Sequence, residues 1–235
     1  MLEVSNLSIK IQDRYLVKNL SLTLNKSDKL AIIGEEGNGK STLLKGILGI
    51  CKYAEVTGNI NLKGNTIGYL AQSMSENELS KKVHDFLFKD DNDYYEKANN
   101  LYKHLELLNL SDKVLEQKIG TLSGGEKVKI GLLKLLINEY DILFLDEPTN
   151  DLDLDSLEWL EKFINNIDKP IMYVSHDETL LANTANMILH LEQIMKKTDC
   201  RNTLLKIDYD TYVTQRLKKI DKQTQIANFE KRTFN

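Results

Sequence analysis

The segment from Gly34 to Ser41 constrains the fold of this chain more than any other part of the sequence. It reads GEEGNGKS and matches the pattern G-x-x-x-x-G-K-[ST]. A loop of this kind turns backbone N–H groups onto phosphate oxygens, and it needs a buried strand before it and a helix after it. The apolar run Lys29–Ile33 precedes the loop, and Leu43 and Leu44 follow at helical spacing. The segment therefore predicts a strand–loop–helix unit of an α/β domain.

The rest of the chain continues this alternation of strands and helices. Further buried strands are predicted at Ile67–Gln72, Asp141–Asp146, Ile171–Val174 and Met187–Leu191. Short half-buried strands are predicted at Leu2–Val4, Leu7–Ile11 and Leu20–Leu24. Strands alternating with helices indicate the α/β class with a mostly parallel core sheet. We also expect an antiparallel β subdomain, a helical subdomain at about residues 76–138, and a C-terminal helix beginning near Tyr209.

Charge is unevenly distributed along the 235 residues. The formal net charge is −4, but the tail from Arg216 onward has six basic and two acidic residues, so it is +4 and the remainder is −8. The basic residues of the tail are Arg216, Lys218, Lys219, Lys222, Lys231 and Arg232. A global attraction to nucleic acid is not indicated, and any such contact is expected from the tail.

The sequence gives no sign of export or membrane insertion. The first ten residues lack the apolar core of a signal peptide, and no run of 18 apolar residues exists. The two cysteines, Cys51 and Cys200, lie far apart, which suits a reducing compartment. We therefore expect a cytoplasmic chain without a transmembrane segment, for which a membrane role would need a separate partner chain.

Two adjacent carboxylates end the predicted strand Asp141–Asp146. Because side chains alternate along a strand, Asp146 and Glu147 are expected to point in different directions. Asp146 can then hold Mg²⁺ together with the Ser41 hydroxyl, while Glu147 faces an attacking water. Lys40 is expected to reach the β- and γ-phosphates. With the phosphate loop, this pair indicates a nucleotide hydrolase.

The segment Leu122–Glu126, with sequence LSGGE, has two compatible interpretations. Ser123 and Glu126 have the spacing of a capping box that opens a helix. A helix N-terminus with Gly124 and Gly125 is also an anion site.

These three segments, in this order, resemble the nucleotide-binding domain of the ABC ATPase superfamily, over about residues 1 to 195. The resemblance implies an ABC-type P-loop NTPase fold that binds ATP and Mg²⁺. The implied ATP-binding residues of the loop are Gly34, Glu35, Glu36, Gly37, Asn38, Gly39, Lys40, Ser41 and Thr42. The implied clamp on the ATP of a partner domain is Ser123, Gly124, Gly125 and Glu126.

Three more residues match family positions outside these segments. Tyr15 stands where the family stacks an aromatic ring on adenine, although an edge-strand tyrosine is the alternative. Gln72 matches the glutamine that contacts Mg²⁺ and water, and His176 matches the histidine that senses the γ-phosphate. The resemblance thus implies Glu147, His176 and Gln72 as catalytic residues, and Ser41, Gln72 and Asp146 as metal-binding residues.

The loop Pro148–Asp153, with sequence PTNDLD, and Glu126 resemble the ABC-F family more than transporter domains. ABC-F proteins are translation factors with two such domains joined by a helical linker, and some protect the ribosome against antibiotics. The resemblance implies a nucleotide-binding domain at 1–207, the start of the linker at 208–235, and a ribosome or RNA partner. A solvated surface helix is the alternative for the basic tail.

Each motif occurs once, so the chain is either a fragment of a longer protein or pairs with itself. The stretch between Gln72 and Ser123 is taken up by the helical subdomain, which leaves no room for a large arm insertion. The ATPase subunit of a membrane transporter is the alternative function. A chromosome-maintenance ATPase would need a long coiled-coil insertion, which this sequence lacks.

Overall fold

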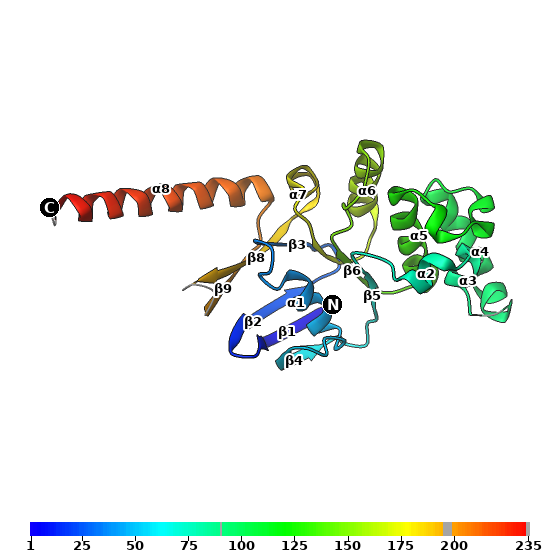
Figure 1. The fold of residues 1–235 in the computed structure, drawn as a ribbon, viewed down its shortest axis with the longest axis horizontal. Coiled ribbons are helices and arrows are strands. Elements are labelled where there is room, and N and C mark those ends of the chain that lie inside the picture. The colour runs from blue at the N-terminus through cyan, green and yellow to red at the C-terminus, as the bar shows by residue number, and fades with distance from the viewer. Residues whose placement is uncertain (90, 195–198, 234–235) are drawn as a thin grey trace.

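The core of the molecule is a six-stranded sheet in the order β5-β6-β7-β3-β8-β9 (Figure 1). The structure is a computed structural model and describes residues 1–89, 91–194 and 199–233. The strands are β3 (Lys29–Ile33), β5 (Ile67–Leu70), β6 (Ile142–Asp146), β7 (Ile171–Val174), β8 (Met187–Ile194) and β9 (Asp199–Leu205). The first five strands in this order run parallel, and β9 pairs antiparallel with β8. The α/β class with a mostly parallel sheet is confirmed.

A second, antiparallel sheet has the order β2-β1-β4, with β1 (Leu2–Ile11), β2 (Arg14–Leu24) and β4 (Glu55–Asn61). The two strands predicted within residues 2–11 are one strand, whose pairing shifts register around Asn6, a residue with φ 52°. Sequence patterns did not indicate β4, because its side chains are mostly exposed and polar and hydrophobic periodicity is absent.

Helices cover the large sheet and extend from both ends of the molecule (Figure 1). They are α1 (Lys40–Ile47), α2 (Glu76–Ser80), α3 (Val83–Leu87), α4 (Asp91–Leu107), α5 (Gly124–Ile137), α6 (Leu154–Asn166), α7 (Glu178–Thr184) and α8 (Tyr209–Thr233). Two short 3-10 helices, at Asp112–Glu116 and Ile119–Thr121, lead into α5. Helices α2 to α5 gather at one end, as expected for a helical subdomain, and α8 extends from the other end.

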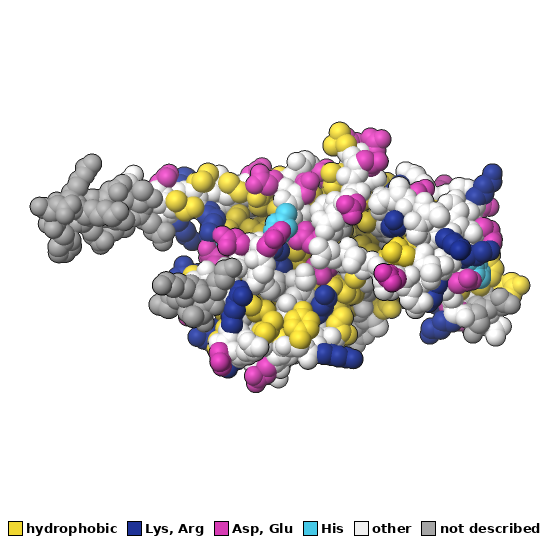
Figure 2. Space-filling model, viewed as in Figure 1, with side chains coloured by type: hydrophobic (Ala, Val, Ile, Leu, Met, Phe, Trp, Pro, Cys, Tyr) yellow, Lys and Arg dark blue, Asp and Glu magenta, His cyan; other side chains and the backbone are white. Residues whose placement is uncertain are grey.

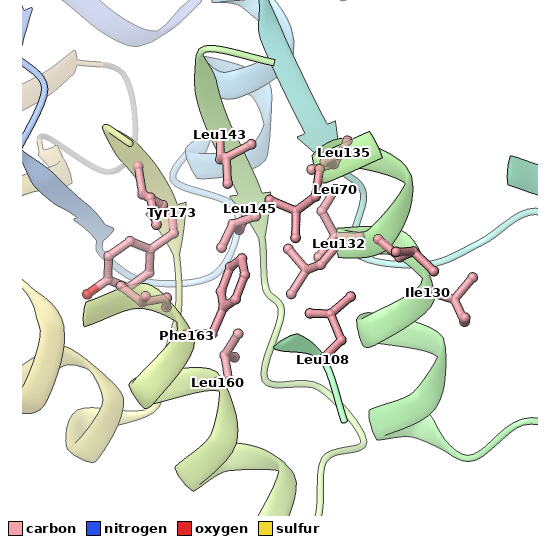
Figure 3. Close-up of a cluster of buried hydrophobic side chains, with 14 of the residues drawn as sticks. Leu70, Leu108, Ile130, Leu132, Leu135, Leu143, Leu145, Leu160, Phe163 and Tyr173 are labelled. Atoms are coloured by element: carbon pink, nitrogen blue, oxygen red, sulfur yellow. The ribbon is translucent and has the colours of Figure 1, made fainter. Parts of the chain in front are cut away.

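Two apolar cores lie on opposite faces of the large sheet, and β6 contributes to both. Ile142 and Phe144 pack with α1 and the small sheet, whereas Leu143 and Leu145 pack with α5 and α6 on the other face (Figure 3). This is the period-two alternation of a strand buried on both sides. The parity of β6 places Asp146 on the same side as Phe144, facing α1.

The first turns of α8 belong to the body of the domain. Tyr212 is buried, and its hydroxyl lies 2.8 Å from Nδ1 of His190 on β8. Arg216 donates a 2.8 Å hydrogen bond to Glu192 on the same strand. The long C-terminal helix expected from the sequence is therefore present and anchored at its start. Residues 234 and 235 of the predicted linker lie outside the described residues.

Lys29, at the start of β3, is buried, and its surroundings predict a pH dependence of stability. Its Nζ donates to the carbonyl oxygens of Ile167 (2.8 Å) and Lys169 (2.7 Å). Burial lowers the pKa of Lys29 from 10.5 to about 8, against the attraction of Asp168. The neutral amine still has two N–H groups, which suffice for both carbonyls.

We predict that the stability of the wild-type protein relative to Lys29→Met increases as pH rises from about 8 to 10. In this window the Lys29 amine keeps its proton in the unfolded chain and loses it in the folded chain. The unfolded state therefore binds more protons, and the free energy of unfolding increases as pH rises. Urea unfolding of both proteins at several pH values measures the difference. If the difference in unfolding free energy between the two proteins does not change with pH, the lowered pKa of Lys29 is wrong.

Candidate functional site

The loop between β3 and α1 adopts a conformation that only glycine tolerates at two positions. Gly34 has φ 146°, and a Cβ there would lie 2.3 Å from the Leu191 carbonyl oxygen. Gly39 has φ 90°, and a Cβ there would lie 2.8 Å from Cβ of Leu16. Positive φ at these points bends the chain so that consecutive N–H groups can point into one hollow, which is the geometry of an anion site. The local requirement for glycine is therefore met as the motif predicts.

Neighbouring strands hold this loop from the side. The Asn38 side chain is buried, and its Nδ2 donates to the Leu191 carbonyl oxygen on β8 at 3.0 Å. Arg14 donates to the Gly37 carbonyl oxygen at 2.9 Å and to Gln193 at 3.0 Å. No sequence motif indicates Arg14, because its partners are far away in the chain.

Tyr15 lies on β2 between two residues that contact the loop, Arg14 and Leu16. Its ring is partly buried, with the Nζ atoms of Lys10 and Lys18 at 5.7 and 5.3 Å from the ring centroid. The structure therefore places Tyr15 on the strand that contacts the phosphate loop through its two neighbours. Its contact with a base stays a prediction.

Lys40 is buried at the centre of the loop. Its Nζ donates to the carbonyl oxygens of Gly34 (2.8 Å) and Glu35 (3.1 Å). Burial lowers the pKa of Lys40, and the carboxylates of Glu147, Glu36 and Asp146 oppose this effect. The side chains of Glu35 and Glu36 are exposed. On the next turn, the Thr42 hydroxyl lies 3.3 Å from the Tyr53 hydroxyl.

Asp146 is buried at the end of β6 and accepts two hydrogen bonds. Its Oδ1 accepts from the Ser41 hydroxyl at 2.7 Å, and its Oδ2 accepts from the Tyr69 hydroxyl at 2.7 Å. Burial and the neighbouring carboxylate raise the pKa of Tyr69 far above its ordinary value of 10, so the phenol keeps its proton. No sequence motif indicates Tyr69, although it lies in the strand that leads to Gln72.

The residues around Asp146 fit a magnesium ion. Mg²⁺ in proteins takes oxygen ligands, commonly one or two carboxylates completed by substrate phosphates. Here the Ser41 hydroxyl directs its proton to Asp146, so that its lone pairs are free to face a cation beside the phosphate loop. Two of the three predicted metal-binding residues, Ser41 and Asp146, therefore lie in hydrogen-bond contact, and their role toward a metal stays a prediction.

Glu147 follows Asp146 and turns away from it. Its backbone N–H donates to the Val174 carbonyl oxygen at 3.0 Å, and its φ is 51°, a conformation that costs a non-glycine residue on the order of 1–3 kcal/mol. Its Oε1 lies 3.2 Å from Nε2 of His176, which follows β7. Burial raises the pKa of Glu147, while the positive charge that His176 carries when protonated lowers it. The structure therefore brings the predicted base and the predicted histidine together.

Gln72 lies on the exposed loop after β5, at a groove with a volume of about 770 Å³. Glu147 and Tyr69 also line this groove, together with apolar residues such as Met74 and Leu79. Gln72 thus shares a groove with the predicted base.

The segment Ser123–Glu126 opens α5, in the helical subdomain and away from α1 (Figure 1). Ser123 and Glu126 form the predicted capping box: Oγ of Ser123 accepts from the Glu126 N–H at 3.2 Å, and Glu126 accepts from the Ser123 N–H at 2.9 Å. A Cβ on Gly124 would lie 2.2 Å from the Asp151 carbonyl oxygen. The structure therefore does not bring this helix N-terminus to the phosphate loop of its own chain.

Comparison with known proteins agrees with this arrangement. The family model described as ABC transporter matches residues 17–150. The chain is 32% identical over 195 residues to ABC transporter F family member 5 of Arabidopsis thaliana, covering 82% of this chain and 28% of the relative. It is 35% identical over 185 residues to the ribosome protection protein VmlR of Bacillus subtilis (strain 168), covering 79% and 33%.

A dimeric ATP-binding cassette solved in a post-hydrolysis state with ADP and Pi has a similar fold. Its TM-score is 0.65 at 19% identity, and the alignment covers 86% of this chain and 98% of that chain. The chain spans about a third of the length of the curated relatives it matches. Among the described residues, no helix combines the length and apolarity needed to cross a membrane.

The phosphate loop, the paired carboxylates after β6 and the capped glycines of α5 are thus the parts of one known domain type. The chain belongs to the ABC transporter family and is an ABC-type ATPase domain with ABC-F proteins among its relatives.

Proposed function

We propose that the loop from Gly34 to Thr42 holds the phosphates of ATP, with the adenine stacked on Tyr15. The convergence of Lys40, Asp146, Glu147 and His176 at the ends of three adjacent strands supports this proposal most directly. Lys40 exchanges its loop carbonyl partners for the β- and γ-phosphates, because a charged phosphate oxygen is the stronger acceptor.

In the same proposal Ser41, Asp146 and Gln72 hold Mg²⁺, which neutralises charge on the phosphates when bound. Glu147 orients the attacking water and accepts its proton, helped by a carboxylate pKa that burial raises toward the working pH. His176, whose Nε2 lies 3.2 Å from Oε1 of Glu147, is the residue that senses the γ-phosphate.

The site is proposed to be complete only when a second ABC domain supplies the Ser123–Glu126 end of its α5. That helix N-terminus carries a partial positive charge that suits a γ-phosphate, and within one chain it lies away from α1. The second domain is either another copy of this chain or a domain in a longer protein. The cassette solved as a dimer with ADP and Pi supports pairing of this kind. ATP then joins the two domains, and hydrolysis releases them.

The first test replaces Lys40 by Ala. Loss of the charged contacts to phosphate should weaken ATP binding by about two orders of magnitude. Calorimetric titration with Mg-ATP measures the change. Lys45→Ala, on the same helix but away from the loop carbonyls, is the matched control and should bind ATP as the wild type does. Wild-type affinity in Lys40→Ala would contradict the assignment of the loop.

The second test uses Glu147→Gln, which removes the proposed base and keeps the shape of the side chain. With ATP this variant should accumulate a closed pair, visible as a doubled mass in size-exclusion chromatography with light scattering. The isolated wild-type chain should hydrolyse ATP slowly and pair only transiently. Glu178→Gln, an exposed carboxylate on α7, serves as the control.

A further variant separates pairing from ATP binding. Adding Gly124→Ala to Glu147→Gln forces a Cβ against the Asp151 carbonyl oxygen and disturbs the start of α5. The double variant should still bind ATP but remain monomeric. If Glu147→Gln itself is monomeric at high concentration with ATP, pairing between copies of this chain is wrong.

We further propose that ATP-driven pairing gates binding to the ribosome in the cytoplasm, in translation or in antibiotic resistance. The relative VmlR, named a ribosome protection protein, supports this role. Lys218, Lys219 and Lys222 are exposed on α8, whereas Arg216 is paired with Glu192. Hydrophobic side chains stand beside Lys and Arg on the described part of α8 (Figure 2). Exposed cations on a projecting helix suit contact with RNA phosphates.

The alternative is the ATPase subunit of a membrane transporter. The apolar groove beside Gln72 favours it, since that groove could accept a helix from a membrane partner. The two functions differ in partner and not in chemistry.

Co-sedimentation with ribosomes distinguishes them. The Glu147→Gln protein with ATP should sediment with ribosomes, and binding should decrease with salt. Lys218→Glu with Lys219→Glu should weaken binding severalfold, whereas Lys103→Glu on α4, at the other end of the molecule, should not. Absence of sedimentation at low salt would contradict the ribosomal role.

A further inference from the structure

Tyr69 lies on the strand that leads to Gln72, and its side chain reaches the buried carboxylate of Asp146. It lies on β5, which pairs in parallel with β6, and Tyr69 is directly opposite Phe144. This register brings the phenol to the end of β6, where its hydroxyl donates to Oδ2 of Asp146 at 2.7 Å. The ring is partly buried and packs against the core formed by α1 and the small sheet. Both the position and the direction of the hydroxyl are therefore set by the sheet.

The two oxygens of Asp146 have different donors. The Ser41 hydroxyl donates a hydrogen bond to Oδ1. Among the hydrogen bonds of the described residues, Tyr69 is the one donor to Oδ2. Asp146 is 1% exposed, so water reaches its carboxylate poorly. Without the Tyr69 hydroxyl, Oδ2 would be a charged acceptor left without a partner, and the carboxylate could rotate to take the Ser41 hydroxyl with either oxygen.

We propose that Tyr69 is a positioning residue for the metal site: its hydroxyl holds the Asp146 carboxylate in the one orientation that directs Oδ1 toward Ser41 and the bound cation. This inference rests on the metal role of Asp146 under the proposed function. Groups that hydrogen-bond to metal-binding carboxylates typically change metal affinity by about 10- to 100-fold when removed. Among the hydrogen bonds of the described residues, Tyr69 reaches the phosphate loop only through Asp146, so its removal is expected to affect the metal more than the nucleotide.

The test removes only the hydroxyl. Tyr69→Phe keeps the ring in its packing. Mn²⁺ serves as the metal probe and is titrated into a mixture of the 235-residue chain and the non-hydrolysable nucleotide adenylyl imidodiphosphate, with the chain in excess over the nucleotide. Electron paramagnetic resonance of free Mn²⁺ gives the affinity in the ternary complex. Nucleotide affinity with excess EDTA is measured in parallel. Tyr173→Phe is the matched control, since it removes a buried hydroxyl that bonds Thr184 on the opposite face of the sheet.

Tyr69→Phe should weaken Mn²⁺ binding about tenfold and leave the metal-free nucleotide affinity unchanged, while Tyr173→Phe changes neither. Equal losses with and without metal would overturn the inference, because they would indicate a general structural role. Asp146→Asn tests the metal role of Asp146 separately from its contact with Tyr69. If Asp146→Asn does not bind Mn²⁺ and the Mn²⁺ affinity of Tyr69→Phe is within twofold of wild type, only the inference about Tyr69 is wrong. If Asp146→Asn keeps wild-type Mn²⁺ affinity, the proposed metal role of Asp146 is wrong as well.

Discussion

The parallel pairing of β3, β6 and β7 is the constraint on which the rest of the structure depends. Lys29 to Ile32 of β3 pair with Ile171 to Val174 of β7, and β6 pairs with the other side of β7. Carboxyl ends of parallel strands meet at one edge of a sheet, and in open α/β sheets that edge is where ligands bind. The phosphate loop, the two carboxylates and the histidine loop follow these three strands, so backbone hydrogen bonds between strands determine which functional groups meet.

Burial on both faces of the sheet gives each functional side chain its direction. The alternation of β6 sends Phe144 to one core and Leu145 to the other, and this parity continues into Asp146, which meets Ser41 on the α1 side. The next residue has left the regular strand, since Glu147 has a positive φ and faces His176. Neighbouring carboxylates thereby acquire different surroundings: one is satisfied by two hydroxyl donors, and the other has a pKa raised by burial.

Under the proposed function, the site of one chain is completed by the α5 end of a second domain. The start of α5 is a well-formed capped helix end, packed against the loop at Asp151, but it belongs to the helical subdomain and not to the hollow around Lys40. A phosphate bound at one domain can attract such an end only from another domain, and a ligand at a shared surface links binding to association. The first turns of α8 are anchored on β8, and the same strand accepts the Asn38 hydrogen bond of the phosphate loop. Strand β8 therefore joins the start of α8 to this loop.

The sequence by itself determined the features that depend on neighbours a few residues apart. These are the glycine loop between a buried strand and a helix, the Ser123–Glu126 capping box, the carboxylates that end β6, and the long helix from Tyr209. Only the tertiary structure decided that Tyr69 bonds Asp146 and that Asn38 bonds Leu191, because these contacts depend on strand order and register. It also decided where β4 pairs, since only Val56 and Ile60 of this mostly exposed strand pack against the core and its position is set by backbone pairing with β1.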